Sequence, residues 1–130
     1  MENKKNIKEW EKQSKYDLET AKAMFEKGRY IYCVFMCHLS LEKMLKGLYS
    51  RNLNKTPPKI HSLVYFVRIQ NLDLFEEIIK FLEELDEVSV PTRYPEELEQ
   101  LLKVYDKKRT QTILSQTEEV WACLKKKFAK

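Results

Sequence analysis

The longest hydrophobic pattern in the chain lies in residues 30–51, YIYCVFMCHLSLEKMLKGLYSR. At about 100° per residue, its apolar side chains cover most of the circumference of a helix. The clearly polar remainder is a narrow strip made of Ser40, Lys43 and Gly47, with Lys46 off to one side. Because a helix this apolar needs neighbours on several sides, we expect residues 30–51 to form the central helix of the fold.

Two ionisable residues interrupt the apolar side of this helix. His38 and Glu42 are four residues apart and project into the middle of the apolar stripe, and Lys46 follows one turn later at its edge. A carboxylate in a dry core costs several kcal/mol unless it is paired. Either the helix buries a polar network of His38 and Glu42, or this side opens on a cleft or a partner.

The pattern before the central helix predicts an antiparallel neighbour. Apolar residues recur at helical spacing from about Ile7 to Lys27. Gly28 follows, and glycine favours the left-handed backbone that ends helices. Arg29 then begins a tight return, so the first two helices should lie side by side in opposite directions.

After the central helix, the stretch NKTPP at 54–58 predicts a loop. A short third helix should follow and end near Ile69, with His61 or Ser62 as the capping residue at its start. A fourth helix is predicted at 74–88. Its expected inward face is Leu74, Phe75, Ile78, Ile79, Leu82 and Leu85, and the side chains expected to face water or a basic partner are Glu76, Glu77, Glu83, Glu84, Asp86 and Glu87.

Two prolines predict a break at 90–95, before a short helical piece at 96–104. Asp106 is the expected cap of a last helix that carries its apolar residues to the lysine-rich end. The predicted fold class is therefore all-α, an antiparallel up-and-down bundle of four main helices plus a short one. At 130 residues, the whole chain 1–130 is expected to form a single domain.

Composition narrows the classes of function. The net charge of +4 permits contact with RNA, nucleotide phosphates or an acidic partner but requires none of them. With only 2 glycines there is no Gly-rich phosphate loop. Cys33, Cys37 and Cys123 fit reduced thiols of a cytoplasmic protein, and their spacing predicts no metal site. No apolar run is long enough to cross a membrane, no signal-peptide core begins the chain, and no cofactor is expected.

Three segments read in order carry a resemblance to a known family. They are A21-x6-G28-R29-Y30, then L41-E42-K43-M44-L45-K46-G47-L48 with H61-S62-L63 behind a proline-containing loop, and finally R93-Y94-P95. From about Trp10 to Phe128 this order resembles the HEPN family of small helical domains. The resemblance implies an up-and-down helical bundle that usually forms a homodimer and is linked to nucleotides or RNA. It also implies a minimal nucleotidyltransferase partner, in a toxin–antitoxin or defence pair.

Many HEPN proteins are metal-independent ribonucleases that carry an Arg followed, after four to six residues, by a His. Here the residues at those offsets from Arg93 are Leu98, Glu99 and Gln100, and no histidine follows His61. RNA cleavage of this type needs a base for the 2′-hydroxyl and a cation for the developing phosphorane. We therefore predict no catalytic residue and a non-catalytic binding domain. The alternatives are a ribonuclease whose base is His38 or His61, and a purely structural interaction module.

Five residues are the candidates for binding a nucleotide or RNA phosphate: Arg93, Tyr94, His61, Lys43 and Lys46. A guanidinium can clamp a phosphate, a tyrosine ring can stack on a base, and lysines can act as point charges. Each also has a structural alternative. The basic side chains can pair with carboxylates of their own or neighbouring helices, the histidine can cap a helix, and the tyrosine can fill the edge of the core.

Overall fold

The computed structural model describes residues 2–93 and 96–128, and within them the side chains of residues 7–89, 91 and 96–128. This part of the chain contains helices and no strand. The helices are α1 (Glu2–Glu26), α2 (Tyr30–Leu53), α3 (Leu63–Ile69), α4 (Glu76–Arg93), α5 (Leu98–Val104) and α6 (Lys107–Phe128). The predicted all-α class is confirmed. None of the described helices is long and apolar enough to cross a membrane.

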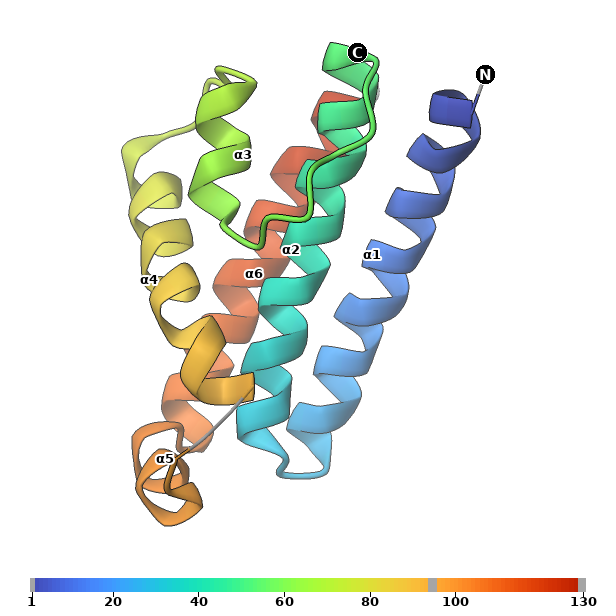
Figure 1. Cartoon of the computed structure of the whole chain (residues 1–130). Helices are drawn as coiled ribbons and strands as arrows, with labels where there is room; N and C mark the ends of the chain where they lie inside the picture. Colours follow the sequence, from blue (N-terminus) through green and yellow to red (C-terminus); the bar gives the residue numbers. More distant parts are fainter. Residues whose placement is uncertain (1, 94–95, 129–130) are drawn as a thin grey trace.

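The four long helices run alternately up and down, and α2 lies between α1 on one side and α4 and α6 on the other (Figure 1). The loop at 54–62 runs back along α2 and leads into α3, which covers the upper part of the bundle beside α4. This is the antiparallel arrangement that the sequence predicts.

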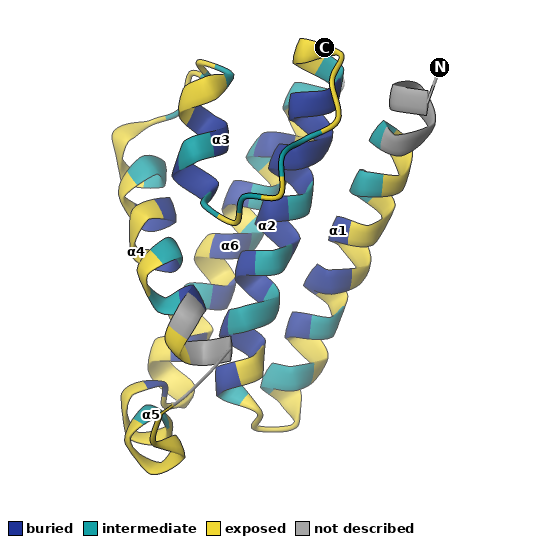
Figure 2. Ribbon diagram, viewed as in Figure 1, coloured by how far each residue is buried: buried dark blue, intermediate teal, exposed yellow. Residues whose placement is uncertain are grey.

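Helix α2 is the centre of the core, as its apolar pattern predicts. Buried residues occur along almost its whole length, from Ile31 to Ser50 (Figure 2). The largest cluster of buried side chains joins α2 to α3, α4 and α6 through residues such as Leu41, Phe66, Leu82 and Leu124. Fully burying one such side chain stabilises the fold by about 1.5–3 kcal/mol.

Local signals in the sequence fix several helix ends. Gly28 ends α1 with φ of +74°, and the N–H groups of Gly28 and Arg29 donate to the carbonyls of Phe25 and Met24. This pair of bonds satisfies carbonyls that the end of a helix leaves open. Ser62 caps α3 by accepting a hydrogen bond from the Tyr65 N–H, and Asp106 caps α6 by accepting one from the Arg109 N–H. These predicted caps are confirmed.

Two details of α4 differ from the prediction. The helix does not break at Val90 but continues through Pro91 to Arg93, because a proline this close to the end of a helix removes only one backbone hydrogen bond. At the other end, Phe75 does not line the inward face. Its carbonyl accepts from the N–H groups of Ile78 and Ile79 at the start of the helix, and its side chain is 77% exposed, whereas Phe81 is buried.

Helices α1, α2 and α6 approach one another closely around small residues. The buried Ser14 and Ser40 hydroxyls each donate to the other residue's carbonyl, at 2.6 and 2.9 Å. The indole N–H of Trp121 donates to the Ser14 hydroxyl at 2.8 Å. About two turns after Ser40 on α2, Gly47 has no side chain, so the side chains of Trp10 and Phe128 can approach the helix backbone.

The close approach at Gly47 predicts that a larger residue there destabilises the protein. A Cβ atom at this position would lie 2.9 Å from Cβ of Trp10 and 2.9 Å from Cζ of Phe128. Because Trp10 Cβ is fixed to the backbone of α1, Gly47→Val should lower the free energy of unfolding by about 1–3 kcal/mol. Urea unfolding measures this effect. Ser115→Val, on the exposed side of α6, is the control, and an equal loss in both variants would contradict the packing described.

Candidate functional site

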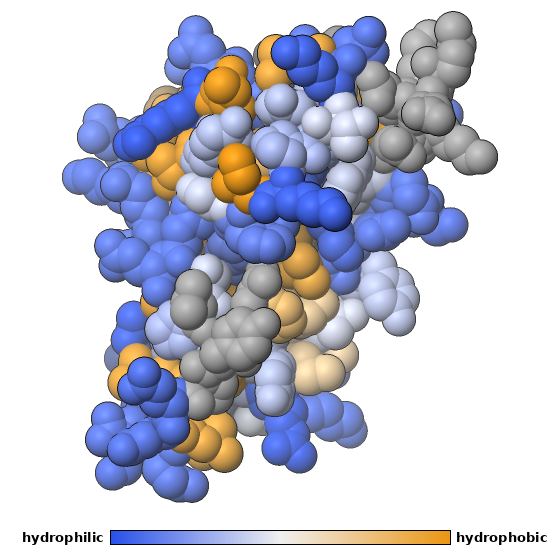
Figure 3. Space-filling model, in the orientation of Figure 1, coloured by the Kyte–Doolittle hydropathy of each residue, from blue (hydrophilic) through white to orange (hydrophobic). Residues whose placement is uncertain are grey.

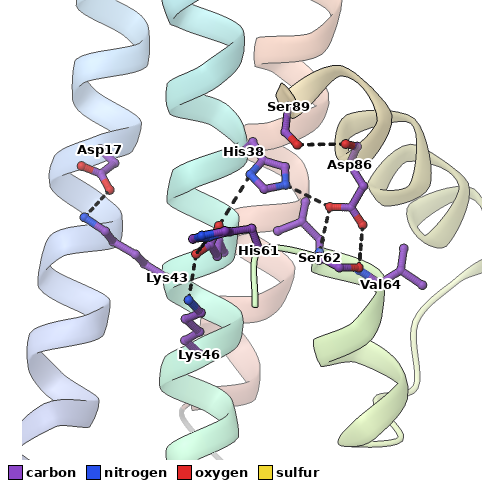
Figure 4. Close-up of polar contacts among 11 residues, drawn as sticks. Asp17, His38, Lys43, Lys46, His61, Ser62, Val64, Asp86 and Ser89 are labelled. Carbon is purple, nitrogen blue, oxygen red and sulfur yellow. Dashed lines mark hydrogen bonds and ion pairs between the residues drawn. The ribbon is translucent and has the colours of Figure 1, made fainter. Parts of the chain in front are cut away.

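A buried carboxylate on α2 is the centre of a polar cluster (Figure 4). Glu42 is only 3% exposed. Its Oε2 atom accepts hydrogen bonds from Lys46 Nζ at 2.9 Å and from His61 Nδ1 at 3.0 Å. Because His61 belongs to the loop at 54–62 and Glu42 belongs to α2, their hydrogen bond holds this loop against the central helix.

Competing effects determine the charge of Glu42. Burial raises the pKa of its carboxyl, but hydrogen bonds and charge interactions with Lys46 and His61 together outweigh burial and lower the pKa below its usual range. An ionised carboxylate only accepts hydrogen bonds, so the proton of His61 must lie on Nδ1. The Nε2 atom of His61 is then free for a ligand, and the His61 side chain is 60% exposed.

A second carboxylate, on α4, holds the start of α3. Asp86 Oδ1 accepts from the backbone N–H of Leu63 at 2.8 Å, and Oδ2 accepts from the Val64 N–H and the Ser62 hydroxyl, both at 3.1 Å. Helix N-termini have unpaired N–H groups and a partial positive charge, which favour a carboxylate there. Asp86 thus fixes the direction in which the chain leaves the loop at 54–62 and enters α3.

The position of Asp86 corrects the prediction that it faces water or a basic partner. Burial raises the pKa of Asp86, but the hydrogen bonds from His38 and from the backbone of Leu63 and Val64 outweigh burial, so the pKa is lowered. The inward direction was legible in the sequence, because Asp86 lies four residues after Leu82, on the apolar side of the helix. The run of acidic residues around it concealed this signal.

His38 lies between the two carboxylates and is hydrogen-bonded to one of them. Its Nε2 atom lies 2.9 Å from Asp86 Oδ1, and its Nδ1 atom lies 3.8 Å from Glu42 Oε1, which is beyond hydrogen-bond distance. Because the ionised Asp86 carboxylate only accepts, Nε2 of His38 carries the proton of that bond. The side chain of His38 is fully buried. One set of hydrogen bonds therefore joins Lys46 and His61 to Glu42, and a second set joins His38 and the first turn of α3 to Asp86.

The structure brings together only part of the predicted phosphate site. His61 and Lys46 meet at Glu42, and Lys46 Nζ also lies 5.7 Å from the centre of the Phe66 ring. Lys43 points to the other side of α2, where its Nζ atom lies 2.8 Å from Asp17 of α1 (Figure 4). Arg93 is the last residue of α4, and its side chain lies outside the described part of the chain, as does the whole of Tyr94.

A basic stretch that the sequence reasoning overlooked surrounds His61. Residues 51–72 contain four Lys or Arg residues and no Asp or Glu. Among the described residues, no ion pair joins Lys55, Lys59 or Arg68 to a carboxylate, and all three are exposed. A shallow groove of about 370 Å³ lies over the outer face of α3, next to Ser62, Tyr65 and Arg68. The absence of acidic residues over this length is the sequence signal that would have identified the stretch.

No metal site accompanies these residues. Within the part of the chain that the structure describes, no three His, Cys, Asp or Glu side chains are arranged to hold a metal ion. Cys33 and Cys37 are buried in the core, and their mutual hydrogen bond, together with burial, raises the pKa of Cys33. The Cys33 thiol is therefore favoured in its protonated form.

The role of Asp86 predicts a large effect of removing its charge. Asp86→Asn keeps the shape of the side chain, but its amide nitrogen replaces one of the two oxygens and cannot accept the hydrogen bonds made at that position. We expect the free energy of unfolding to fall by about 2–3 kcal/mol, because hydrogen bonds to charged groups are strong and a buried donor is left unpaired. Glu87→Gln, at the neighbouring exposed position, is the matched control. Similar unfolding curves for the two variants would show that Asp86 does not hold α3.

The lowered pKa values of Glu42 and Asp86 predict a loss of stability in acid. Their ordinary pKa values are 4.5 and 3.8, and both are lower in the folded chain. The stabilisation they provide is complete above the ordinary values and disappears as the pH falls through the folded values. Urea unfolding in a pH series should therefore show a falling free energy of unfolding below about pH 4.5. The slope in this range should be shallower for Glu42→Gln and Asp86→Asn than for Glu87→Gln, and an unchanged slope would be inconsistent with the lowered pKa values.

Comparison with known proteins places the chain in a family. The family model described as HEPN domain matches residues 7–127. Among solved structures, TT1696 from Thermus thermophilus is similar with a TM-score of 0.80 and 22% identity, covering 93% of this chain and 97% of that one. ST0689, an archaeal HEPN homologue, has a TM-score of 0.74 at 22% identity, covering 93% and 96%. The sequence has no match among curated proteins. The structural likeness supports the fold, and the family match over nearly the whole chain shows that this protein belongs to the HEPN domain family.

Proposed function

We propose that this HEPN domain binds the phosphate groups of a nucleotide or of RNA without cleaving them. We further propose that it acts beside a separate minimal nucleotidyltransferase, in a toxin–antitoxin or defence pair. The observation that carries the binding proposal is that the stretch 51–72 around His61 contains no acidic residue and has exposed basic side chains. We call Lys55, Lys59, His61 and Arg68 of this stretch the basic strip.

The charges of the basic strip suit a phosphate backbone. Its lysines and arginine are exposed and have no carboxylate partner among the described residues, so no ion pair has to be broken when a phosphate binds. The groove beside Arg68 is lined by the half-buried ring of Tyr65, on which a base can stack. A positive groove with an aromatic side chain is the usual arrangement for binding single-stranded nucleic acid.

The buried cluster supports the same ligand. Glu42 holds His61 by its Nδ1 atom, so that Nε2 faces outward and, in the imidazolium form, donates to a phosphate oxygen. Lys46 lies 2.9 Å from Glu42 and balances its charge, which reduces the repulsion that a buried carboxylate would exert on an anion. In this proposal Lys46 acts by positioning Glu42 and His61, and Lys43 supports α2 against α1 through Asp17.

Arg93 and Tyr94 remain candidates for the same ligand, as the clamp for a phosphate and the ring for a base. The nucleotidyltransferase partner is proposed from membership in the HEPN domain family. Co-purification of this chain with the protein encoded by a neighbouring reading frame would test the proposed partnership.

Ribonuclease activity is the second candidate function, and one observation favours it. His61 combines an exposed Nε2 atom with a carboxylate that orients its ring, which is the arrangement of a general base. In that reaction Nε2 would take the proton of a 2′-hydroxyl as its oxygen bonds to the adjacent phosphorus. The bond from phosphorus to the 5′-oxygen of the next nucleotide would break, and that oxygen would leave with a proton from water. The two functions are distinguished by measuring both the binding and the cleavage of the same RNA.

Binding of a fluorescent single-stranded RNA and of ATP tests the proposal directly. The double variant Lys59→Ala/Arg68→Ala should bind RNA about tenfold more weakly and show a smaller salt dependence, by about 1 in the slope for each lost phosphate contact. His61→Ala should weaken binding as well. The matched control is Lys80→Ala, which removes an exposed lysine from the acidic face of α4.

Denaturing gels of the same mixtures should show intact RNA. Absence of binding to RNA and nucleotides at low salt would overturn the proposal, as would equal losses in the control and in the double variant. RNA cleavage that disappears in His61→Ala would replace the binding function by the ribonuclease.

A further inference from the structure

A small hollow lies between the first half of α1 and the loop at 54–62, outside the buried polar cluster. Its volume is about 200 Å³, and the described side chains that line it are Glu9, Trp10 and Gln13 of α1 with Thr56 and Pro57 of the loop. Sites for drug-sized ligands usually have volumes of about 300–1,000 Å³. The size of this hollow therefore suits a single flat ring system. We call it the Trp10 hollow.

The Trp10 hollow combines an aromatic side chain with hydrogen-bonding groups. Trp10 is half-buried, so part of its surface is open to a ligand. Glu9 and Gln13 are exposed, and Gln13 Nε2 donates to Glu9 Oε1 at 3.3 Å. The Oε2 atom of Glu9 has no hydrogen-bond partner among the described residues. A ring that stacks on Trp10 would therefore meet a carboxylate that still has room to accept hydrogen bonds at its edge.

The loop that closes this hollow also carries lysines of the basic strip. Lys55 directly precedes Thr56, and Lys59 follows Pro57 by two residues. Both lysines are exposed. An unpaired base in the Trp10 hollow would therefore have its phosphates near positive charges. This combination of an aromatic side chain and nearby cations is typical of sites for single-stranded nucleic acid.

The Trp10 hollow and the groove beside Tyr65 lie on different sides of this loop. In Figure 1 the loop at 54–62 crosses the front of α2, with α3 on one side and α1 on the other. Figure 3 shows strongly hydrophilic side chains among pale ones of intermediate hydropathy over the upper half of this face, where the loop crosses α2. Two aromatic side chains on either side of a lysine-bearing loop, Trp10 and Tyr65, suit two bases of one strand. A single nucleotide has only one base, so this arrangement favours RNA.

The carboxylate of Glu9 favours one base over the others. An ionised carboxylate only accepts hydrogen bonds, and its two oxygens can accept from two neighbouring donors. On its Watson–Crick edge guanine presents two adjacent donors, the N1–H and the N2 amino group. Adenine and cytosine each present one amino donor beside an acceptor nitrogen, and uracil presents one N–H between two carbonyl oxygens. Only guanine therefore places a donor opposite each oxygen of Glu9.

We propose that the Trp10 hollow binds a guanine base of the single-stranded RNA whose phosphates lie on the basic strip. Trp10 stacks on the base, Glu9 accepts from its N1–H and N2 amino group, and Gln13 positions Glu9. This inference rests on the proposed function, because the RNA has to be bound for its base to be recognised. It adds the class of ligand, a polynucleotide, and a preference for one base.

Binding of four RNA octamers tests the proposal. All positions are uridine except one in the centre, which is guanosine, adenosine, cytidine or inosine. Inosine keeps the N1–H of guanosine but lacks its N2 amino group. The unmodified chain at low salt should bind the guanosine octamer about tenfold more tightly than the adenosine or cytidine octamer. The inosine octamer should bind with intermediate affinity, since one of the two hydrogen bonds remains.

Glu9→Gln is the variant that separates base recognition from phosphate binding. Its side chain has nearly the same shape, but its amide nitrogen faces a donor of guanine. The variant should lose the preference for guanosine and bind the adenosine octamer as the unmodified chain does. Glu19→Gln, at another exposed position of α1, is the matched control and should keep the preference.

Tryptophan fluorescence tests the stacking. The chain contains 2 tryptophans, Trp10 and Trp121, and the indole N–H of Trp121 donates to the buried Ser14. The guanosine octamer should quench the fluorescence of the unmodified chain. Trp10→Phe keeps an aromatic ring and the Cβ atom that packs at Gly47, and in this variant the quenching should disappear.

The outcomes distinguish this inference from the proposed function. Equal binding of all four octamers would overturn the recognition of guanine and leave phosphate binding by the basic strip intact. A preference for guanosine that persists in Glu9→Gln, or quenching that persists in Trp10→Phe, would place the base elsewhere and overturn the inference as well. If none of the octamers binds, both the proposed function and this inference are wrong.

Discussion

The fold depends on keeping two carboxylates ionised inside a helical bundle. Glu42 on α2 and Asp86 on α4 both have lowered pKa values although burial acts to raise them. The cost of removing such charges from water is several kcal/mol for each, and it must be balanced by hydrogen bonds. For Glu42 these come from Lys46 and His61, and for Asp86 from His38 and the first N–H groups of α3.

The same bonds position the surface to which we assign a function. The loop at 54–62 and the short α3 have few helical hydrogen bonds of their own, and Glu42 and Asp86 attach the junction between them to the long helices. His61 therefore presents Nε2 from a ring held by Glu42, in a stretch of chain whose exposed Lys55, Lys59 and Arg68 have no carboxylate partner among the described residues. Stability and the proposed binding of phosphate thus share one set of contacts. A change at Glu42 would alter both, whereas a change at Lys59 or Arg68 would alter binding alone.

Much of the fold was predictable because the dominant signal is simple. An apolar pattern over nearly the whole circumference of residues 30–51 requires a central helix, and Gly28, Ser62 and Asp106 mark helix ends by local chemistry. Predictions failed where tertiary contacts overrode the local pattern. Asp86 stands in an acidic run but points inward to His38, and Phe75 is exposed and precedes the helix, which begins at Glu76, two residues later than predicted.

The candidate site was less predictable for a related reason. Sequence spacing showed that His38 and Glu42 are ionisable residues on an apolar helix face and would need partners. It did not reveal that the partner of Glu42 is His61 and that the partner of His38 is Asp86, both from distant segments. It also grouped Lys43 with Lys46, although Lys43 pairs with Asp17 of α1 and Lys46 pairs with Glu42. Arg93 and Tyr94 stay predictions, since their side chains lie outside the described part of the chain.

The tautomers of the two histidines test this account most directly. The chain contains only 2 histidines, so their ring nitrogen signals can be assigned without ambiguity by nitrogen-15 NMR. With both carboxylates ionised, neutral His61 should carry its proton on Nδ1, which donates to Glu42, and neutral His38 should carry its proton on Nε2, which donates to Asp86. Opposite tautomers in the two rings are the predicted result. A His61 ring protonated on Nε2, or a His38 ring protonated on Nδ1, would contradict it.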